Sequence, residues 1–296
     1  MHLKIGTRSS PLALAQTNIV INALKKHIDF SYEIVEVKTT GDLILHKPLY
    51  EIGGKSLFLK ELEEALLSKK IDFAVHSLKD VPGEVDARFM LGCYLVREYH
   101  EDSFVSIKYT NIEELPSLGK IGTCSPRRAA FIMKKRKDLK ILPLRGNINS
   151  RMVSLRNGNF DAIILAEVGL RRLSIYDSSY CHQINIKDMI PAVGQGVITC
   201  EILKENNALY AILQHINDIQ TSQRVLIERE FLEYLKADCK TPVAAFVSSI
   251  EVGSKSNFMI GSNDLSRMRA IERPIEKFEI GLGEKIAKEI TKDFVF

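Results

Sequence analysis

The first third of the chain alternates between strand-like and helix-like patterns, and this alternation constrains the fold more than any other feature. Apolar and β-branched residues predict strands over 3–6, 32–39 and 73–78. Apolar residues at helical spacing predict helices over 11–26 and 57–69. Strands that alternate with helices usually pair in parallel within one sheet. The pattern therefore predicts an α/β fold.

Two helices share the same start signal, a serine followed by a proline. Ser10 and Ser125 each place a hydroxyl oxygen at the N-cap, and Pro11 and Pro126 fit the first helical position. The second signal opens a second α/β set. Its strands are predicted over 104–107, 121–123, 139–144 and 162–165, and its helices over 127–137 and 147–157.

The rest of the chain follows a different plan. A turn over 191–196 leads into a strand over 197–203, which fits a return of the chain to the first domain. A long helix is predicted over 221–235. Runs that favour antiparallel strands come next, and together with a final helix they indicate a third, α+β domain. These elements are predicted over 243–252, 258–261, 268–275 and 278–291.

The segment 40–55 breaks the alternation, because Gly41, Pro48, Gly53 and Gly54 interrupt it. We interpret it as a long mobile loop, a feature that is often functional in compact domains. The string Gly53-Gly54-Lys55-Ser56 ends like a phosphate-binding loop. It lacks the upstream glycine and a strand that leads directly into it, so a P-loop is not expected.

Cysteine usage and the lack of targeting signals indicate the compartment. The five cysteines are scattered over 296 residues without a Cys-x-x-Cys pair, which argues against a disulfide framework and against a cysteine zinc site. We expect no bound metal. Neither a secretory leader nor an apolar run of bilayer length stands out. We therefore expect a cytoplasmic protein without a membrane partner.

Positive charge gathers in the middle of the chain. The segment 120–172 holds thirteen lysines or arginines and three acids, although the net charge is only +4. The excess fits either an anionic partner or a solvated basic face. A nucleic-acid partner is not expected, because this segment offers only Phe131 and Phe160 for stacking on bases.

Several polar side chains follow the predicted strands, at the sheet edge where ligands of open α/β sheets bind. Arg8 lies just before a helix, and Arg127 and Arg128 lie in a first helical turn, where free backbone N–H groups attract anions. Lys79-Asp80 offers either a proton donor and base or a surface ion pair. Cys239 offers either a covalent attachment point or an inert small side chain.

A series of short motifs, taken in order, closely resembles the porphobilinogen deaminase family, also called hydroxymethylbilane synthase. The match runs from Lys4 to about Val252. The motifs are Gly6-Thr7-Arg8-Ser9-Ser10-Pro11-Leu12-Ala13, Gly41-Asp42, Gly53-Gly54-Lys55-Ser56-Leu57-Phe58, His76-Ser77-Leu78-Lys79-Asp80-Val81-Pro82, Gly122-Thr123-Cys124-Ser125-Pro126-Arg127-Arg128, Leu144-Arg145-Gly146-Asn147, Ala192-Val193-Gly194-Gln195-Gly196 and Cys239.

The resemblance implies a transferase of tetrapyrrole and haem biosynthesis. It condenses four porphobilinogen molecules head to tail, with loss of ammonia, into hydroxymethylbilane. The implied cofactor is a dipyrromethane joined to Cys239 by a thioether. The implied fold has two α/β domains like those of periplasmic binding proteins around a cleft, and a smaller α+β C-terminal domain. The domains are expected over 1–97 with 194–215, over 98–193, and over 216–296, in a chain that acts as a monomer.

The resemblance also implies roles for single residues. Asp80 matches the catalytic carboxylate, and the remaining matches contact either the cofactor or the substrate. The expected cofactor contacts are Lys79, Ser125, Arg127, Arg128 and Arg145. The expected substrate contacts are Arg8, Ser10, Lys55, Phe58, Arg151, Arg172 and Gln195. Two positions depart from the family pattern: Asp238 replaces a glycine before Cys239, and Glu51 stands where relatives often have lysine.

Overall fold

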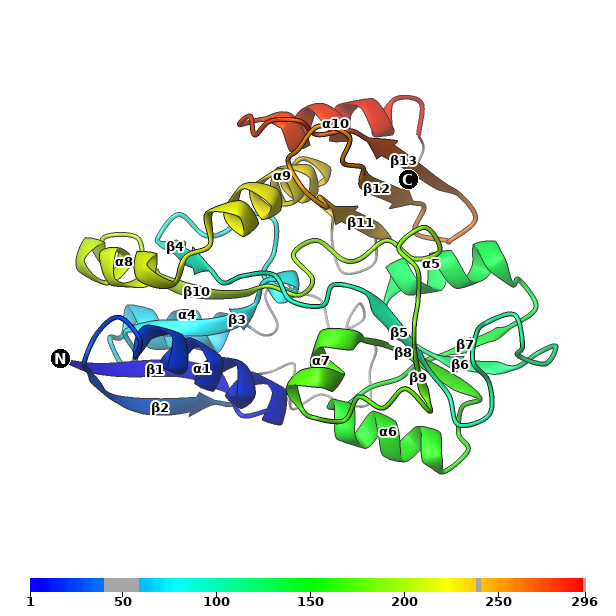
Figure 1. Cartoon of the computed structure of the whole chain (residues 1–296), viewed down its shortest axis with the longest axis horizontal. Helices are drawn as coiled ribbons and strands as arrows, with labels where there is room; N and C mark the ends of the chain where they lie inside the picture. Colours follow the sequence, from blue (N-terminus) through cyan, green and yellow to red (C-terminus); the bar gives the residue numbers. More distant parts are fainter. Residues whose placement is uncertain (40–58, 238–240, 295–296) are drawn as a thin grey trace.

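Three β-sheets organise the chain. The structure is a computed structural model that describes residues 1–39, 59–237 and 241–294. Within these ranges two sheets have five strands each, and the third has three (Figure 1). The predicted class, two α/β units followed by a smaller α+β unit, is confirmed. The predicted loop over 40–55 lies outside the described residues, as do Lys55, Phe58 and Cys239.

The first sheet combines the start of the chain with a later strand. Its order is β2 (Ser31–Val37), β1 (His2–Arg8), β3 (Phe73–Ser77), β10 (Ile198–Leu203) and β4 (Phe89–Tyr94). Strand β1 is parallel to both neighbours, whereas β10 is antiparallel to β3 and β4. The helices of this unit are α1 (Pro11–Leu24), α4 (Lys60–Leu67) and α8 (Asn207–Leu213), followed by the 3-10 helix η2 (Gln214–Ile216).

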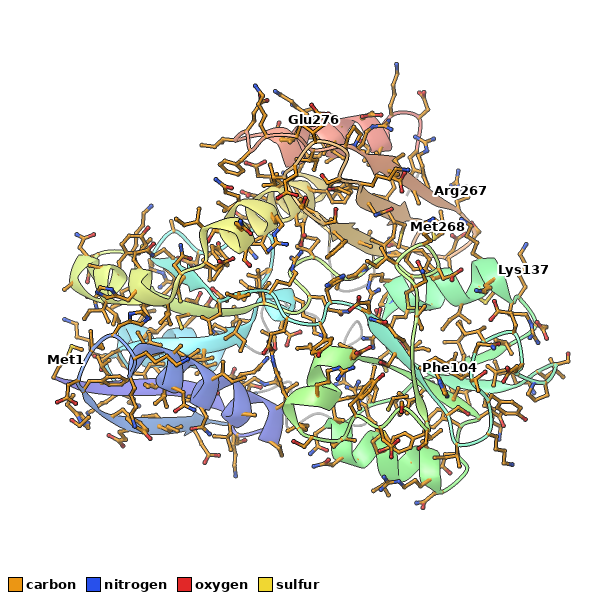
Figure 2. All side chains as sticks on the ribbon, in the orientation of Figure 1. Met1, Phe104, Lys137, Arg267, Met268 and Glu276 are labelled. Atoms are coloured by element: carbon orange, nitrogen blue, oxygen red, sulfur yellow. The ribbon has the colours of Figure 1, made fainter. Side chains whose placement is uncertain are left out.

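The second sheet is built on the same plan. Its order is β7 (Lys140–Leu142), β6 (Lys120–Gly122), β8 (Ala162–Ala166), β5 (Asp102–Val105) and β9 (Cys181–Gln183). All five residues of β8 are buried, as its continuous apolar sequence predicts for a strand covered on both faces. Phe104 of β5, labelled in Figure 2, is 1% exposed within this core. The helices are α5 (Pro126–Lys135), α6 (Ile148–Arg156) and α7 (Glu167–Arg172).

The third sheet is antiparallel throughout. It consists of β11 (Val243–Phe246), β12 (Ser256–Gly261) and β13 (Met268–Arg273), with the helices α9 (Ile219–Leu235) and α10 (Leu282–Thr291). Phe231 of α9 meets Phe258 of β12 with ring centroids 5.1 Å apart, and both side chains are fully buried. The described strands fall within the segments predicted for each domain. The exact boundaries stay a prediction.

The two helix starts predicted from a serine followed by a proline are confirmed, whereas α10 begins at Leu282 and not at the predicted Phe278. The hydroxyl of Ser10 accepts a hydrogen bond from the backbone N–H of Ala13, and the hydroxyl of Ser125 accepts one from Arg128. A proline occupies the first turn in both helices. Asn147 caps α6 in the same way, because its side chain accepts a hydrogen bond from the N–H of Ser150. Two of these caps, Ser10 and Asn147, line a cavity between the first two units.

The expectation of parallel pairing was wrong for β5, whereas for β10 only a return to the first domain was predicted, with no direction. Each is antiparallel to its neighbours, because the chain reaches both strands by crossing between sheets rather than through a helix packed on the same sheet. Six of the described elements were not predicted: β4, β9, α7, α8, η2 and the 3-10 helix η1 (Leu78–Asp80). Strand β9 has three residues and α7 has six, too few to show a period, and Gly92 interrupts the apolar run of β4.

The predicted strand over 243–252 is shorter than expected and ends at Phe246. The reason is a hydrogen bond, because the N–H of Val247 turns to the carboxylate of Glu228 on α9 at 2.8 Å. Glu228 also receives two bonds of 2.8 Å from Arg97 and one of 2.9 Å from the N–H of Gly194. Arg97 and Gly194 lie on the two segments that cross between the first and second sheets. One buried carboxylate therefore holds both crossings against the third unit.

We predict that Glu228→Gln destabilises the folded protein by about 3–5 kcal/mol, since it leaves the guanidinium of Arg97 buried without a counter-charge. The side chains of the pair are 3% and 0% exposed. The denaturant midpoint of the purified variant measures the loss. Glu64→Gln is the matched control, because the Lys60–Glu64 pair is exposed and its atoms are 4.0 Å apart. Equal midpoints for the two variants would contradict the role of Glu228.

Candidate active site

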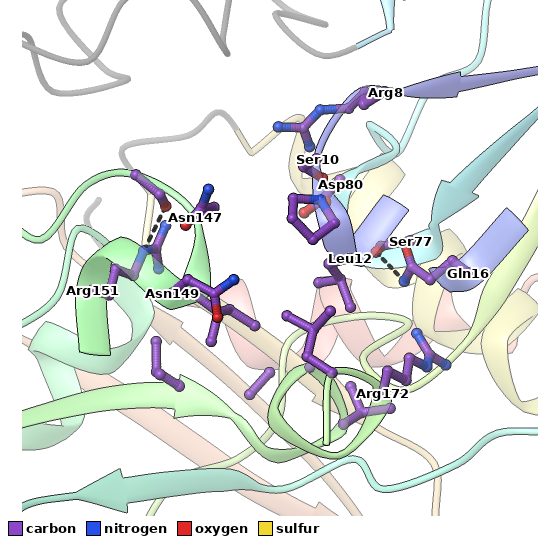
Figure 3. A pocket seen from close by; sticks show the side chains of 18 of the residues that line it. Arg8, Ser10, Leu12, Gln16, Ser77, Asp80, Asn147, Asn149, Arg151 and Arg172 are labelled. Atoms are coloured by element: carbon purple, nitrogen blue, oxygen red, sulfur yellow. Dashed lines mark hydrogen bonds between the residues drawn. The ribbon is translucent and has the colours of Figure 1, made fainter. Parts of the chain in front are cut away.

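A cavity of about 600 Å³ lies between the first and second units and collects most of the predicted site residues. Among the described residues its walls carry six cations and one carboxylate, that of Asp80. Figure 3 shows Arg8, Ser10 and Asp80 on one side and Asn147, Asn149 and Arg151 on the other. The cations are Arg8, Lys79, Arg128, Arg145, Arg151 and Arg172. An excess of five positive charges makes this cavity a site for a polyanion.

Asp80 reaches the cavity because β3 runs directly into a short 3-10 helix, η1 (Leu78–Asp80). Leu78 anchors this turn: its side chain is buried, and its N–H donates to the carbonyl of Val197 at 3.0 Å. Just before it, the hydroxyl of Ser77 accepts a bond of 2.7 Å from the side chain of Gln16 on α1. Asp80 itself is exposed to the cavity. A carboxylate at such a place can exchange protons with a bound ligand.

Two helix N-termini face the same space. The residues Ser10–Leu12 of the α1 start and 147–151 of the α6 start both line the cavity. Free backbone N–H groups and the helix dipole favour carboxylates at these positions. The turn before α6 requires glycine, because Gly146 has a φ of +93° and a Cβ there would lie 2.3 Å from the hydroxyl of Ser150.

Arg128 is held in place by a carboxylate that the sequence did not single out. Its Nη2 and Nε donate to Oδ1 of Asp102 at 2.7 and 3.2 Å, and its Nη1 donates to the carbonyl of Ile164 at 2.9 Å. Arg127 pairs with the other oxygen of Asp102 at 2.7 Å. Burial alone would raise the pKa of Asp102, but the two guanidiniums outweigh it and hold that pKa below its usual range.

Arg151 and Arg172 are fixed by backbone carbonyls. Nε of Arg151 donates to the carbonyl of Gly146 at 2.8 Å, and Nη2 of Arg172 donates to the carbonyl of Gly196 at 3.0 Å. Glu98 also accepts a bond of 2.7 Å from Nε of Arg172. Burial and then repulsion by Arg128 lower the pKa of Arg151 to about 10. A cation whose pKa is lowered in this way is stabilised when a ligand brings negative charge.

Burial also changes the protonation of Lys79. Loss of water around the amine lowers its pKa to about 8, and repulsion by Arg128 and Arg127 adds to this, while Asp80 and Asp102 oppose it. The amine is therefore charged near neutral pH but becomes neutral in mildly alkaline solution. It shares with Arg128 the part of the cavity beside Asp80.

The remaining predicted contacts do not line the main cavity. Ser125 caps α5, and Arg127 is turned toward Asp102 and the carbonyl of Ile190, 2.6 Å away. Gln195 donates to the carbonyl of His100 at 2.7 Å and to Asp102 at 3.2 Å. Lys55, Phe58 and Cys239, like the departures at Glu51 and Asp238, lie outside the described residues. Within the described ranges, no three His, Cys, Asp or Glu side chains are grouped so that they could hold a metal ion.

Two supporting carboxylates, Asp102 and Glu98, were missed. Asp102 stands at the first residue of β5, but the strand was predicted to begin at Phe104, so the acid fell in a loop. An Asp before a strand carries no sequence signal for burial. Its later contacts with residues 127, 128 and 195 come only from the fold.

Two facing α/β units with a cation-rich cavity and one accessible carboxylate define an anion-binding protein equipped for acid–base chemistry. A family model described as "Porphobilinogen deaminase, dipyromethane cofactor binding domain" matches residues 3–211. The porphobilinogen deaminase of Rickettsia canadensis (strain McKiel) is 49% identical over 268 residues, which cover 90% of this chain and 89% of that protein. The corresponding protein of Rickettsia rickettsii (strain Sheila Smith) is 52% identical over 245 residues, 82% of this chain and 70% of its own length.

The chain belongs to the porphobilinogen deaminase family. Members of this family are transferases that condense porphobilinogen into hydroxymethylbilane in tetrapyrrole biosynthesis, and they carry a dipyrromethane cofactor. The activity, substrate and cofactor implied by the motifs are confirmed. Among solved structures, the periplasmic VFT2 domain of BvgS from Bordetella pertussis is similar with a TM-score of 0.46 and 14% identity, over 78% of this chain and 93% of that one. No helix in the described ranges is long and apolar enough to cross a membrane.

The donor set of the cavity fits the cofactor. Each ring of a dipyrromethane carries an acetate and a propionate, so the group is a polyanion. Six cations and two helix N-termini face the cavity, and guanidiniums pair with carboxylates in a bidentate manner. Of the six, Arg128 is fixed from behind by Asp102. The cavity therefore offers preformed carboxylate sites.

We predict that loading of cofactor-free protein with porphobilinogen slows as pH rises through about 8. The Lys79 pKa is depressed to about 8, so its charge is present below that pH and is lost above it. From pH 7 to pH 9 the rate should fall by up to about tenfold, as the charged fraction does. Intact mass followed over time measures loading.

Lys79→Arg should keep its charge and move the fall to higher pH. Lys70→Arg, at an exposed position after α4, is the matched control and should behave like the wild type. The same pH dependence in Lys79→Arg and the wild type would show that another group titrates.

The lowered pKa of Lys79 also affects the stability of the folded protein. Between about pH 8 and the usual lysine pKa of 10.5, Lys79 binds its proton more strongly in the unfolded chain than in the folded protein. The free energy of unfolding therefore rises with pH across that window, and this gain is absent below it.

Proposed function

We propose that Asp80, Cys239 and the six cations of the cavity carry out the family's reaction in this chain. One observation supports this assignment above the others: Asp80 is the one carboxylate that faces the cavity among the described residues, and it stands among six cations. The substrate must lose its amine as a protonated leaving group. In its protonated form, a carboxyl group beside the pyrrole can donate the proton with which the amine leaves as ammonia, and the carboxylate that remains stabilises the positive charge left on the ring.

Cys239 is the proposed attachment point of the cofactor through a thioether. The dipyrromethane, when bound, supplies the pyrrole carbon to which the first substrate is joined. Lys79, Arg128 and Arg145 are proposed to hold its carboxylates. Ser125 and Arg127 support them, the first as the cap of α5 and the second by sharing Asp102 with Arg128.

The substrate carboxylates are proposed to bind on the other cations. Arg8 and Ser10 lie beside Asp80, and Arg151 and Arg172 lie on the second unit. Gln195 stays a proposed contributor to substrate binding. Its side chain donates to Asp102, and we propose that it acts through that carboxylate. Lys55 and Phe58 stay proposed contacts on sequence grounds. Each condensed substrate adds two carboxylates to the growing chain. The cavity therefore needs more cations than a single substrate would bind.

We further propose that the chain acts as a monomer in the cytoplasm, with domains over 1–97 with 194–215, 98–193 and 216–296. All six cavity cations and the carboxylate come from one chain, so a second copy is not required to complete the cavity. The scattered cysteines without a pairing pattern favour a reducing compartment. No nucleic-acid or membrane partner is proposed.

We predict that Asp80→Asn keeps the fold and the cofactor but loses most of the activity, because the amide preserves shape while it removes the charge and the proton. Turnover of porphobilinogen measures activity. Intact mass and peptide mapping measure the dipyrromethane on Cys239. Asp86→Asn is the matched control, since Asp86 lies six residues on and pairs with Arg88 on the surface. Normal turnover by a cofactor-loaded Asp80→Asn enzyme, or an unmodified Cys239 in active protein, would refute the assignment.

We predict two classes of defect among the arginines. Arg128→Gln and Arg145→Gln should give cofactor-free protein. Arg8→Gln, Arg151→Gln and Arg172→Gln should give loaded protein that stops early, with a mass increased by whole substrate units. Loss of one charged contact costs about 1.5–3 kcal/mol, which is enough to block one step. Arg156→Gln, exposed on the same helix as Arg151, is the control. A uniform loss in all five variants would favour a general electrostatic role instead.

A further inference from the structure

Arg229 lies outside the cavity, yet it contacts the turn that carries Asp80. It belongs to α9, and its Nη2 donates to the carbonyl of Pro82 at 2.9 Å and to the carbonyl of Gly83 at 3.0 Å. Only Val81 separates Asp80 from these two residues. Arg229 is 7% exposed, so the contact is made in the interior, where charge-assisted hydrogen bonds are strong.

The backbone of α9 touches the same turn. A Cβ at Gly83 would lie 3.0 Å from both Cα and N of Glu233 and 3.2 Å from the carbonyl carbon of Leu232. These distances are shorter than ordinary van der Waals contact, so the turn packs on α9 with no room for a side chain. Arg229 on α9 and Gly83 in the turn therefore belong to the same contact between the helix and the turn.

The chain before Asp80 is fixed as well. Nε2 of His76 lies 3.1 Å from Oε2 of Glu201 on β10, and both side chains are buried. The N–H of Leu78 is bonded to Val197. The segment Lys79–Val81 is therefore held at its start by the first sheet and at its end by α9. Only the second anchor comes from another unit of the molecule.

We propose that Arg229 is a positioning residue for Asp80. It holds the carbonyls after the turn and so sets where the carboxylate stands in the cavity. This inference rests on the proposed role of Asp80. A lysine would reach the same carbonyls with a flexible amine in place of a rigid planar guanidinium, so it should replace arginine only in part.

The main test is Arg229→Met in the full-length, cofactor-loaded enzyme. We expect kcat to fall roughly tenfold to a hundredfold, the effect of a small misplacement of a reacting group. KM should stay within about threefold, because no substrate contact is removed. Arg229→Lys should recover part of the loss. Intact mass should show full cofactor loading in both variants.

Arg224→Met is the matched control. Arg224 lies on the same helix and donates to the carbonyl of Ser248 at 3.0 Å, away from the turn. Both Met variants should lower the melting temperature, but only Arg229→Met should lower kcat. Hydrogen exchange supplies a readout that does not depend on activity: amides of the 78–84 segment should exchange faster in Arg229→Met and not in Arg224→Met.

Two further variants keep the proposal falsifiable if Arg229→Met does not fold. Gly83→Ala pushes the turn from the helix while Arg229 is intact, and it should reproduce the loss of kcat. Arg229→Lys combined with Asp80→Asn should be no slower than Asp80→Asn alone, because arginine is proposed to act through the carboxylate. Independent, multiplying losses would overturn the proposal, and so would normal kcat in both Gly83→Ala and Arg229→Lys. An active Asp80→Asn enzyme would instead overturn the proposed function itself.

Discussion

The cavity depends on one buried carboxylate, Asp102, which is held between Arg127 and Arg128. Its Oδ1 binds Arg128 and its Oδ2 binds Arg127, each at 2.7 Å, and it is fully buried. Two adjacent arginines in a first helical turn would repel each other and the helix dipole. Asp102 offsets that repulsion and fixes Arg128 at the cavity wall. It also binds Gln195 on the returning segment, so the wall and the crossing are secured together.

Charge explains why the cavity is prepared for its ligands. Six cations and one carboxylate face the cavity, and two of the cations, Arg128 and Arg172, are already paired with the acids Asp102 and Glu98 behind the wall. Burial of Lys79 and Arg151 lowers their pKa values, and repulsion by Arg128 adds to this effect. The carboxylates of a bound tetrapyrrole precursor bring negative charge next to these cations. Binding therefore stabilises the charged forms of Lys79 and Arg151. Lysine and arginine respond differently: Lys79 can lose its proton in mild alkali, whereas the guanidiniums stay charged.

Much of the fold follows from local signals in the sequence. Ser10-Pro11 and Ser125-Pro126 mark helix starts that the structure confirms, because capping and proline geometry are decided within a few residues. The pairing of β10 was expected only as a return to the first domain. Its antiparallel direction depends on the path of the whole chain. Short elements such as α7 were missed for lack of a period.

The site also contains residues that the sequence could predict and residues that it could not. Arg8, Lys79, Asp80 and Arg145 follow strands, and their convergence could be predicted from the rule that ligands bind at strand ends. Their supports could not. Asp102 is 26 positions from Arg128, and Arg229 is 147 positions from Pro82. Nothing in either local sequence indicates these contacts, because a buried ion pair or carbonyl contact becomes visible only after the units have packed.

The distribution of supports around Asp80 has a physical consequence for the whole molecule. Glu201 of β10 and Val197, just before that strand, fix the chain before the carboxylate, and Arg229 of α9 fixes the chain after it. Both elements come more than a hundred positions later in the sequence, after the strands and helices of the second unit. The contacts that hold the Asp80 turn are therefore complete only when the third unit has packed on the first. Because Glu228, next to Arg229 on α9, also holds both crossings, the same helix secures the geometry of the turn and the path of the chain.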